Sequence, residues 1–245
     1  MTTFIKRALS TLILGPLTIL ILWMGFPYAQ SLIGLLFVMC FIEWFRLCFV
    51  TENDQQNWRK VLWFSFGTGY IVFSFIAIFY FVYLSPGILI GILSLVWASD
   101  IGAYLVGMIV GGPKCFPTMS PNKTWSGVCG GFMMSVGTGY LLITHTDWKV
   151  FNLDGSYSLQ ANLIVVACIA LISQLGDLLE SSVKRHFRVK DTGNLIPGHG
   201  GILDRLDSPI AVGFVSFVCI VMNIFYTFIQ TAPSGAIIFR PFASF

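Results

Sequence analysis

Long apolar runs dominate this sequence and restrict its fold more than any other feature. Several of them are about 20 residues long, and a helix rising about 1.5 Å per residue needs that length to cross a hydrocarbon core of about 30 Å. Only 10% of the residues are charged, against roughly 25% in soluble domains. The strict apolar–polar alternation of barrel strands is absent. We therefore predict an all-α, polytopic integral membrane protein.

The sequence predicts about seven transmembrane helices, within a range of six to nine. The predicted spans are residues 8–25, 29–49, 61–83, 87–110, 126–144, 159–180 and 209–230. The first run follows two basic residues, as in a signal peptide, but no convincing cleavage site follows it, so we interpret it as an uncleaved span. We expect a single membrane-embedded domain over 1–245, with N-terminal spans in 1–90 and catalytic spans and cytoplasmic loops in 91–245.

Lysine and arginine are distributed unevenly between the predicted loops. With a cytoplasmic N-terminus, 12 of the 14 basic residues lie inside and two lie outside. The inside set is Lys6, Arg7, Arg46, Arg59, Lys60, Lys114, Lys123, Lys184, Arg185, Arg188, Lys190 and Arg205, and the outside set is Lys149 and Arg240. This bias predicts an N-in, C-out topology.

Composition also excludes several classes of function. The six cysteines form no CxxC pair, so neither a disulfide framework nor a zinc site is expected. No extended basic surface with interleaved aromatic residues lies outside the spans, so nucleic acid is not an expected partner. The basic loops suit anionic head groups or a nucleoside triphosphate instead.

Ionisable residues inside predicted spans are candidates for function, because burying an unpaired charge is costly. Glu43 and Arg46 lie three residues apart on one helix face, and we interpret them mainly as a structural pair. Asp100 lies mid-span without a charged neighbour in sequence. It is either a carboxylate bonded to hydroxyl groups or, as we prefer, part of a site.

The end of the sixth predicted span carries a polar stripe. At 100° per residue, Ser173, Asp177, Glu180, Ser181 and Lys184 fall along one helix face, while the rest of the helix is apolar. A polar stripe within a span is expected to line a cavity rather than to face lipid.

A Gly-rich turn at residues 197–201 follows this stripe, and Asp204 and Asp207 come next, three residues apart. Glycines let backbone N–H groups approach an anion closely. Carboxylate oxygens suit Mg²⁺, which shares its shell with phosphates and water. Asp177, Asp204 and Asp207 are therefore candidates to hold one or two divalent ions. His199 lacks a Cys or His partner nearby, so we expect it to bind phosphate or to shape the loop.

A second polar cluster occupies residues 114–124, on another loop predicted to be cytoplasmic. Ser120-Pro121-Asn122 is typical of a turn. Lys123 and Thr124 then precede the fifth predicted span, where free N–H groups and the helix dipole favour an anion. An ordinary turn with a cytoplasmic lysine explains this loop equally well.

The charged block at residues 181–207 reads SSVKRHFRVKDTGNLIPGHGGILDRLD. It resembles, over more than a dozen positions, the signature of the phosphatidate cytidylyltransferase (CDP-diacylglycerol synthase) family. Ser99-Asp100 with Ala103-Tyr104, and the segment 120–125 (SPNKTW), also resemble family segments. The resemblance covers most of the chain from about residue 95, and the first 90 residues match only as generic spans.

This resemblance implies a reaction, its cofactor and its site. The reaction is CTP + phosphatidate → CDP-diacylglycerol + diphosphate with Mg²⁺, held as a metal pair. The implied catalytic residues are the metal ligands Asp177, Asp204 and Asp207, together with Lys184. The implied substrate-binding residues are Asp100, Ser120, Asn122, Lys123, Thr124, Ser181, Arg185, Lys190, Asp191, His199, Gly200, Gly201 and Arg205.

The expected partners are CTP, phosphatidate and membrane lipids, and a homodimer is left open. The expected location is the bacterial inner membrane, with the site facing the cytoplasm. Two other functions compete with this reading. One is a CTP-dependent polytopic lipid kinase, which transfers the terminal phosphoryl group. The other is a transporter of an anionic solute, although the inverted repeats of such proteins are not evident.

Overall fold

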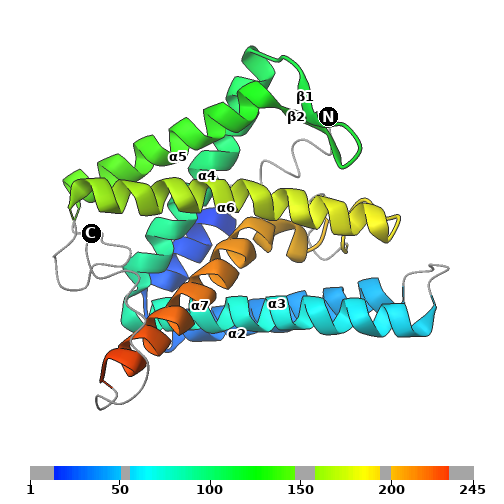
Figure 1. Cartoon of the computed structure of the whole chain (residues 1–245), viewed down its shortest axis with the longest axis horizontal. Helices are drawn as coiled ribbons and strands as arrows, with labels where there is room; N and C mark the ends of the chain where they lie inside the picture. Colours follow the sequence, from blue (N-terminus) through cyan, green and yellow to red (C-terminus); the bar gives the residue numbers. More distant parts are fainter. Residues whose placement is uncertain (1–13, 51–55, 147–157, 194–199, 232–245) are drawn as a thin grey trace.

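A computed structural model describes residues 14–50, 56–146, 158–193 and 200–231, with side chains as far as residue 225 (Figure 1). The elements are a short helix Leu14–Trp23, α2 (Tyr28–Phe49), α3 (Asn57–Leu84), α4 (Pro86–Ile109), β1 (Lys114–Phe116), β2 (Ser120–Thr124), α5 (Trp125–His145), α6 (Leu159–His186) and α7 (Leu203–Thr231). Six of these helices are long and apolar enough to cross a membrane. The prediction of an all-α polytopic membrane protein is confirmed.

Each predicted span overlaps one helix, but several boundaries differ. The first span overlaps only the short helix Leu14–Trp23, and residues 1–13 lie outside the described part. The sixth span was predicted to end at residue 180, whereas α6 continues to His186. The seventh was predicted to begin at residue 209, whereas α7 begins at Leu203. The charged block therefore lengthens two helices, because charged residues suit a helix end that emerges from the apolar layer.

The helices pack as neighbouring pairs, with α7 between α3 and α6 (Figure 1). The most extensive contact joins α4 and α5. Glycines permit it, since a Cβ at Gly102 would lie 2.7 Å from the carbonyl oxygen of Gly130. Small residues let helix backbones approach closely in membranes, where dispersion contacts drive association. The α3–α7 and α6–α7 contacts bring the charged ends of α6 and α7 together.

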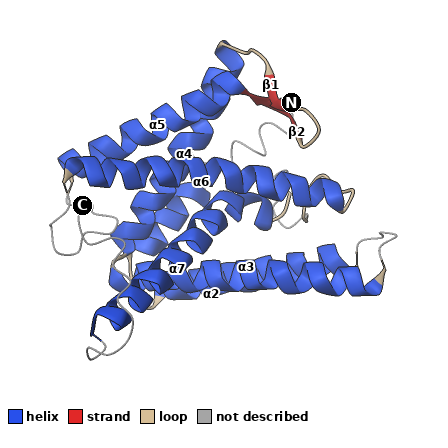
Figure 2. Cartoon of the chain, viewed as in Figure 1, coloured by secondary structure: helices blue, strands red, loops and turns tan. Residues whose placement is uncertain are grey.

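The loop at residues 114–124 is a β-hairpin, the one strand pair among the described residues (Figure 2). The predicted turn at Ser120-Pro121-Asn122 is wrong, because these residues lie in β2 and the turn falls at residues 117–119. The amide of Met119 closes that turn by donating to the Phe116 carbonyl at 3.2 Å. Proline is tolerated in β2 because a two-stranded ribbon leaves an edge of each strand unpaired.

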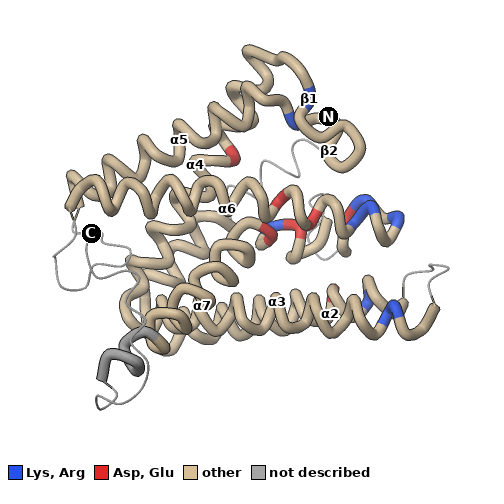
Figure 3. Tube along the Cα trace, viewed as in Figure 1, with Lys and Arg blue, Asp and Glu red and all other residues tan. Residues whose placement is uncertain are grey.

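The charged residues are concentrated toward one end of the bundle. Figure 3 shows the described Lys and Arg residues on that half, with the acidic residues of α6 and α7 close behind them. The opposite end of the described helices carries neither. This asymmetry places the hairpin, the end of α6 and the start of α7 around one polar region.

Candidate active site

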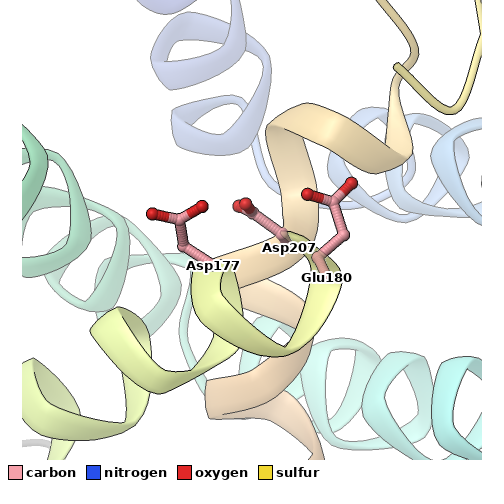
Figure 4. A group of neighbouring side chains, drawn as sticks. All are labelled: Asp177, Glu180 and Asp207. Atoms are coloured by element: carbon pink, nitrogen blue, oxygen red, sulfur yellow. The ribbon is translucent and has the colours of Figure 1, made fainter. Parts of the chain in front are cut away.

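Three carboxylates from two helices converge at this polar region (Figure 4). Asp177 and Glu180 project from α6 and Asp207 from α7, and an oxygen of each lies within 4.8 Å of the others. Like charges this close destabilise one another unless a cation or protons neutralise them. The cluster is therefore a candidate metal centre built from oxygen ligands.

Close packing of α6 against α7 positions these side chains. A Cβ at Gly176 would lie 3.1 Å from the Asp207 carbonyl oxygen, so glycine there allows α7 to approach. Nearby, the buried Ser208 hydroxyl donates to the Ser173 carbonyl at 2.9 Å. The residues next to Asp177 and Asp207 thus hold the two helices together, and the carboxylates are left facing each other.

A lysine from the hairpin reaches the outer carboxylate. The Lys123 ammonium lies 2.7 Å from Oδ2 of Asp177, and it also donates to the Gln174 carbonyl at 3.2 Å. The Asp177 side chain is 39% exposed, so it is the member of the cluster that solutes reach most readily. The pairing joins β2 to α6 across 54 positions of sequence and ties the hairpin to the carboxylate cluster.

A second lysine bridges the inner carboxylates. The Lys184 ammonium lies 2.8 Å from Glu180, one helical turn away, and 2.8 Å from Oδ1 of Asp204. The side chains of Lys184, Glu180 and Asp204 are 13%, 9% and 6% exposed. Oε1 of Glu180 is buried and has no hydrogen-bond partner within the described part of the chain. That orphaned oxygen is available to a cation.

Asp204 and Asp207 have different surroundings, although they lie three residues apart on one helix. Oδ2 of Asp204 accepts hydrogen bonds from the amides of Thr192 at 2.9 Å and Gly201 at 2.8 Å. Gly200 has a φ of +81°, and a Cβ there would lie 2.8 Å from the same oxygen. Asp204 therefore holds the start of α7 against Thr192, whereas Asp207 belongs to the carboxylate cluster.

The structure places most of the expected substrate-binding residues around this region. Asp100 on α4 is exposed and lies within electrostatic reach of Asp177, Lys123 and Arg205. The Arg185 guanidinium donates to the Met119 carbonyl at 3.5 Å, which connects the end of α6 with the hairpin turn. Ser120 and Asn122 lie on β2, Ser181 lies on α6, and Lys190, Asp191 and Arg205 are exposed.

Two expected anion-binding features have other partners in the structure. Thr124 is buried and caps α5, its hydroxyl accepting from the Gly127 amide at 3.2 Å. The Gly201 amide already donates to Asp204, so the Gly-rich turn directs that N–H toward a carboxylate. His199 lies outside the described residues.

Sequence reasoning did not assign two residues that the fold brings to this region. Gln174 on α6 donates to the Ser99 hydroxyl at 3.3 Å and to the Val128 carbonyl at 3.1 Å, joining α6 to α4 and α5. Glu43 on α2, interpreted from its spacing as a structural partner of Arg46, accepts hydrogen bonds from the start of α7. An acidic residue in an apolar span signals some role, but partners about 160 positions away are invisible to local spacing.

The same polar region coincides with a family match. A sequence model of the Cytidylyltransferase family matches residues 48–225. The chain belongs to the cytidylyltransferase family. Its match contains the hairpin, the carboxylate cluster and the charged block, so the predicted family resemblance is confirmed.

Bacterial relatives of this chain carry the name phosphatidate cytidylyltransferase. The protein of Brucella melitensis is 42% identical over 125 residues, which is 51% of this chain and 43% of the relative. That of Staphylococcus aureus (strain COL) is 46% identical over 114 residues, which is 46% of this chain and 41% of the relative. The chain therefore matches less than half the length of these relatives.

Proposed function

We propose that this family member is a phosphatidate cytidylyltransferase, which transfers the cytidylyl group of CTP to phosphatidate. The products are CDP-diacylglycerol and diphosphate. The observation that carries the proposal is the convergence of Asp177, Glu180 and Asp207, with an orphaned oxygen, next to cations at the charged end of a membrane bundle. The names of the relatives supply the substrate class.

The donor set fits a divalent cation. All three ligands offer carboxylate oxygens, which suit Mg²⁺ better than the soft metals that prefer thiolate or imidazole. Oε1 of Glu180 is a ready ligand because nothing else bonds it among the described residues. In the proposed site Asp177, Glu180 and Asp207 hold Mg²⁺, as one ion or a pair, and Asp204 orients Lys184 beside them. When bound, Mg²⁺ neutralises phosphate charge and orients attacking and leaving oxygens.

The proposed reaction needs positioning more than proton transfer. An oxygen of the phosphatidate phosphate attacks the α-phosphorus of CTP, a new P–O bond forms, and the bond to the bridging oxygen of the β-phosphate breaks. The attacking oxygen is already anionic at neutral pH, so no general base is required. Lys123, within ion-pair distance of Asp177, is placed to meet a phosphate that would share a metal ion with that carboxylate. Arg185, Lys190 and Arg205 supply further positive charge for the triphosphate and the lipid phosphate.

The proposed site faces the cytoplasm of a bacterial inner membrane. The described basic residues lie toward the half of the bundle that carries the site (Figure 3). Lysine and arginine accumulate on the cytoplasmic side of membrane proteins, and CTP is made there. The phosphatidate acyl chains would lie among the apolar helix surfaces while the head group reaches the cluster.

Two positions of radiolabel in CTP test the proposal. Purified protein in detergent micelles is given phosphatidate, Mg²⁺ and CTP labelled on either the α- or the γ-phosphate. We expect α-label in the lipid product and γ-label in released diphosphate. The reverse result, γ-label in the lipid, would identify a lipid kinase, and no lipid labelling from either form of CTP would reject the proposed reaction.

The matched protein control is Thr144→Val. It removes one hydroxyl near the end of α5, where the side chain bonds only within its own helix. It should label the lipid as the unaltered protein does, whereas Asp207→Asn should not.

A further inference from the structure

Glu43 is a buried carboxylate of α2 that bonds to the start of α7. The residue is 3% exposed. Its Oε1 accepts from the Ile202 amide at 2.9 Å and its Oε2 from the Leu203 amide at 2.8 Å. A negative charge is stabilised at a helix N-terminus by free amides and by the helix dipole. Glu43 therefore caps α7 from a different transmembrane helix.

The same carboxylate also reaches the residues that follow α6. The Thr192 hydroxyl donates to Oε2 of Glu43 at 3.3 Å, while the Thr192 amide donates to Asp204. Two carboxylates thus hold Thr192 against the start of α7, Glu43 from α2 and Asp204 from α7 itself. Thr192, six residues after the end of α6, is thereby tied to the start of α7.

Glycines make room for this arrangement. A Cβ at Gly193 would lie 2.7 Å from Oε1 of Glu43. A Cβ at Gly201 would lie 2.8 Å from the same oxygen and would also overlap the Thr192 hydroxyl. Real Cβ atoms do not approach other atoms so closely. Two glycines of the charged block are thereby explained by the Glu43 carboxylate.

We propose that Glu43 is a positioning residue that couples the N-terminal spans to the active site. Its bonds fix the start of α7, where Asp204 holds Lys184 and Lys184 holds Glu180 of the carboxylate cluster. Glu43 lies before residue 48, where the family match begins, so the coupling comes from the part of the chain outside that match. The kinetic consequence rests on the proposed cytidylyltransferase function, whereas the structural consequence does not.

Glu43→Gln tests the coupling in the full-length protein in detergent. The glutamine side chain keeps the volume of glutamate and one hydrogen-bond acceptor, but its NH₂ group would face a backbone N–H donor. We expect hydrogen exchange in peptides spanning 192 and 201–203 to accelerate by about tenfold or more. Peptides from α3 and α5 should exchange as before.

The activity readout is separate. For the same variant, kcat should fall by about 10- to 100-fold, with KM for CTP changed by less than about threefold because the substrate contacts remain. Thr192→Val removes only the hydroxyl bond, so it should produce a smaller change in the same direction. The matched control is Ser74→Ala, a buried polar change on α3 whose hydroxyl bonds within its own helix. It should leave the 192 and 201–203 peptides unchanged.

Unchanged exchange at 192 and 201–203 in Glu43→Gln would overturn the coupling, and so would faster exchange spread evenly over all helices. If Glu43→Gln does not fold, Thr192→Val decides between the same two results. Absence of CDP-diacylglycerol from the unaltered protein would reject the proposed function alone, since the exchange measurement uses no substrate.

Discussion

Replacing Lys184 by an uncharged side chain of the same length should lower the stability of the protein with little change in side-chain shape. Its ammonium bridges Glu180 and Asp204 at 2.8 Å each, and all three side chains are at most 13% exposed. Lys184→Met keeps the length and the apolar stem but leaves both carboxylates without their shared cation. The variant therefore isolates the charge from the packing.

The magnitude follows from what each carboxylate retains. Removing one partner of a buried ion pair costs about 3–5 kcal/mol. Asp204 keeps its two bonds from the amides of Thr192 and Gly201, whereas Glu180 is left with none from the described residues. Because Asp204 keeps these two donors and only Glu180 is left unpaired, we expect the lower end, about 3 kcal/mol. At about 2–4 °C per kcal/mol for a chain of this size, Tm should fall by about 6–12 °C.

Thermal unfolding in detergent, followed by tryptophan fluorescence, measures this effect. Lys190→Met is the matched control, because the same change at an exposed lysine should alter stability by no more than about 0.5 kcal/mol. Glu180→Gln combined with Lys184→Met should recover part of the loss, since it removes the unpaired charge. Equal Tm values for Lys184→Met and Lys190→Met would refute the reasoning, and so would a double variant less stable than Lys184→Met alone.

Three other predictions follow from the site and its topology. Asp177→Asn should reduce CDP-diacylglycerol synthesis by about 100-fold or more and abolish the rise in Tm on adding Mg²⁺; a full Mg²⁺ response would contradict the metal assignment. Gly201→Ala should destabilise the folded protein by about 1–3 kcal/mol, because the added Cβ overlaps the Glu43 carboxylate. The control Gly137→Ala should be neutral or stabilising, since a Cβ at Gly137 has no atom within 4 Å. Equal unfolding curves for the two variants would contradict the overlap. A cysteine at Lys190, in a background without other cysteines, should react with an impermeant maleimide only after cells are permeabilised, and labelling of intact cells would reverse the proposed topology.

Local sequence determined the features that depend on neighbours along the chain. Run length and hydropathy predict membrane helices because a helix crosses the bilayer at a constant rise per residue. The 100° period places Asp177, Glu180 and Lys184 on one face, and in the structure these three lie along the polar side of α6. The family resemblance came mainly from residues 181–207, with residues 99–104 and 120–125 in support, and it depended on residue identities alone.

Tertiary structure decided which charges meet across helices. Spacing alone gives Asp204 and Asp207 equivalent places on α7, yet the first turns to Lys184 and two amides and the second joins the carboxylate cluster. The reason is that each aspartate faces a different neighbour once α7 packs against α6. Glu43 is the extreme case. Its partners lie about 160 positions away, and only the packing of α2 near the start of α7 brings the carboxylate within reach of those amides.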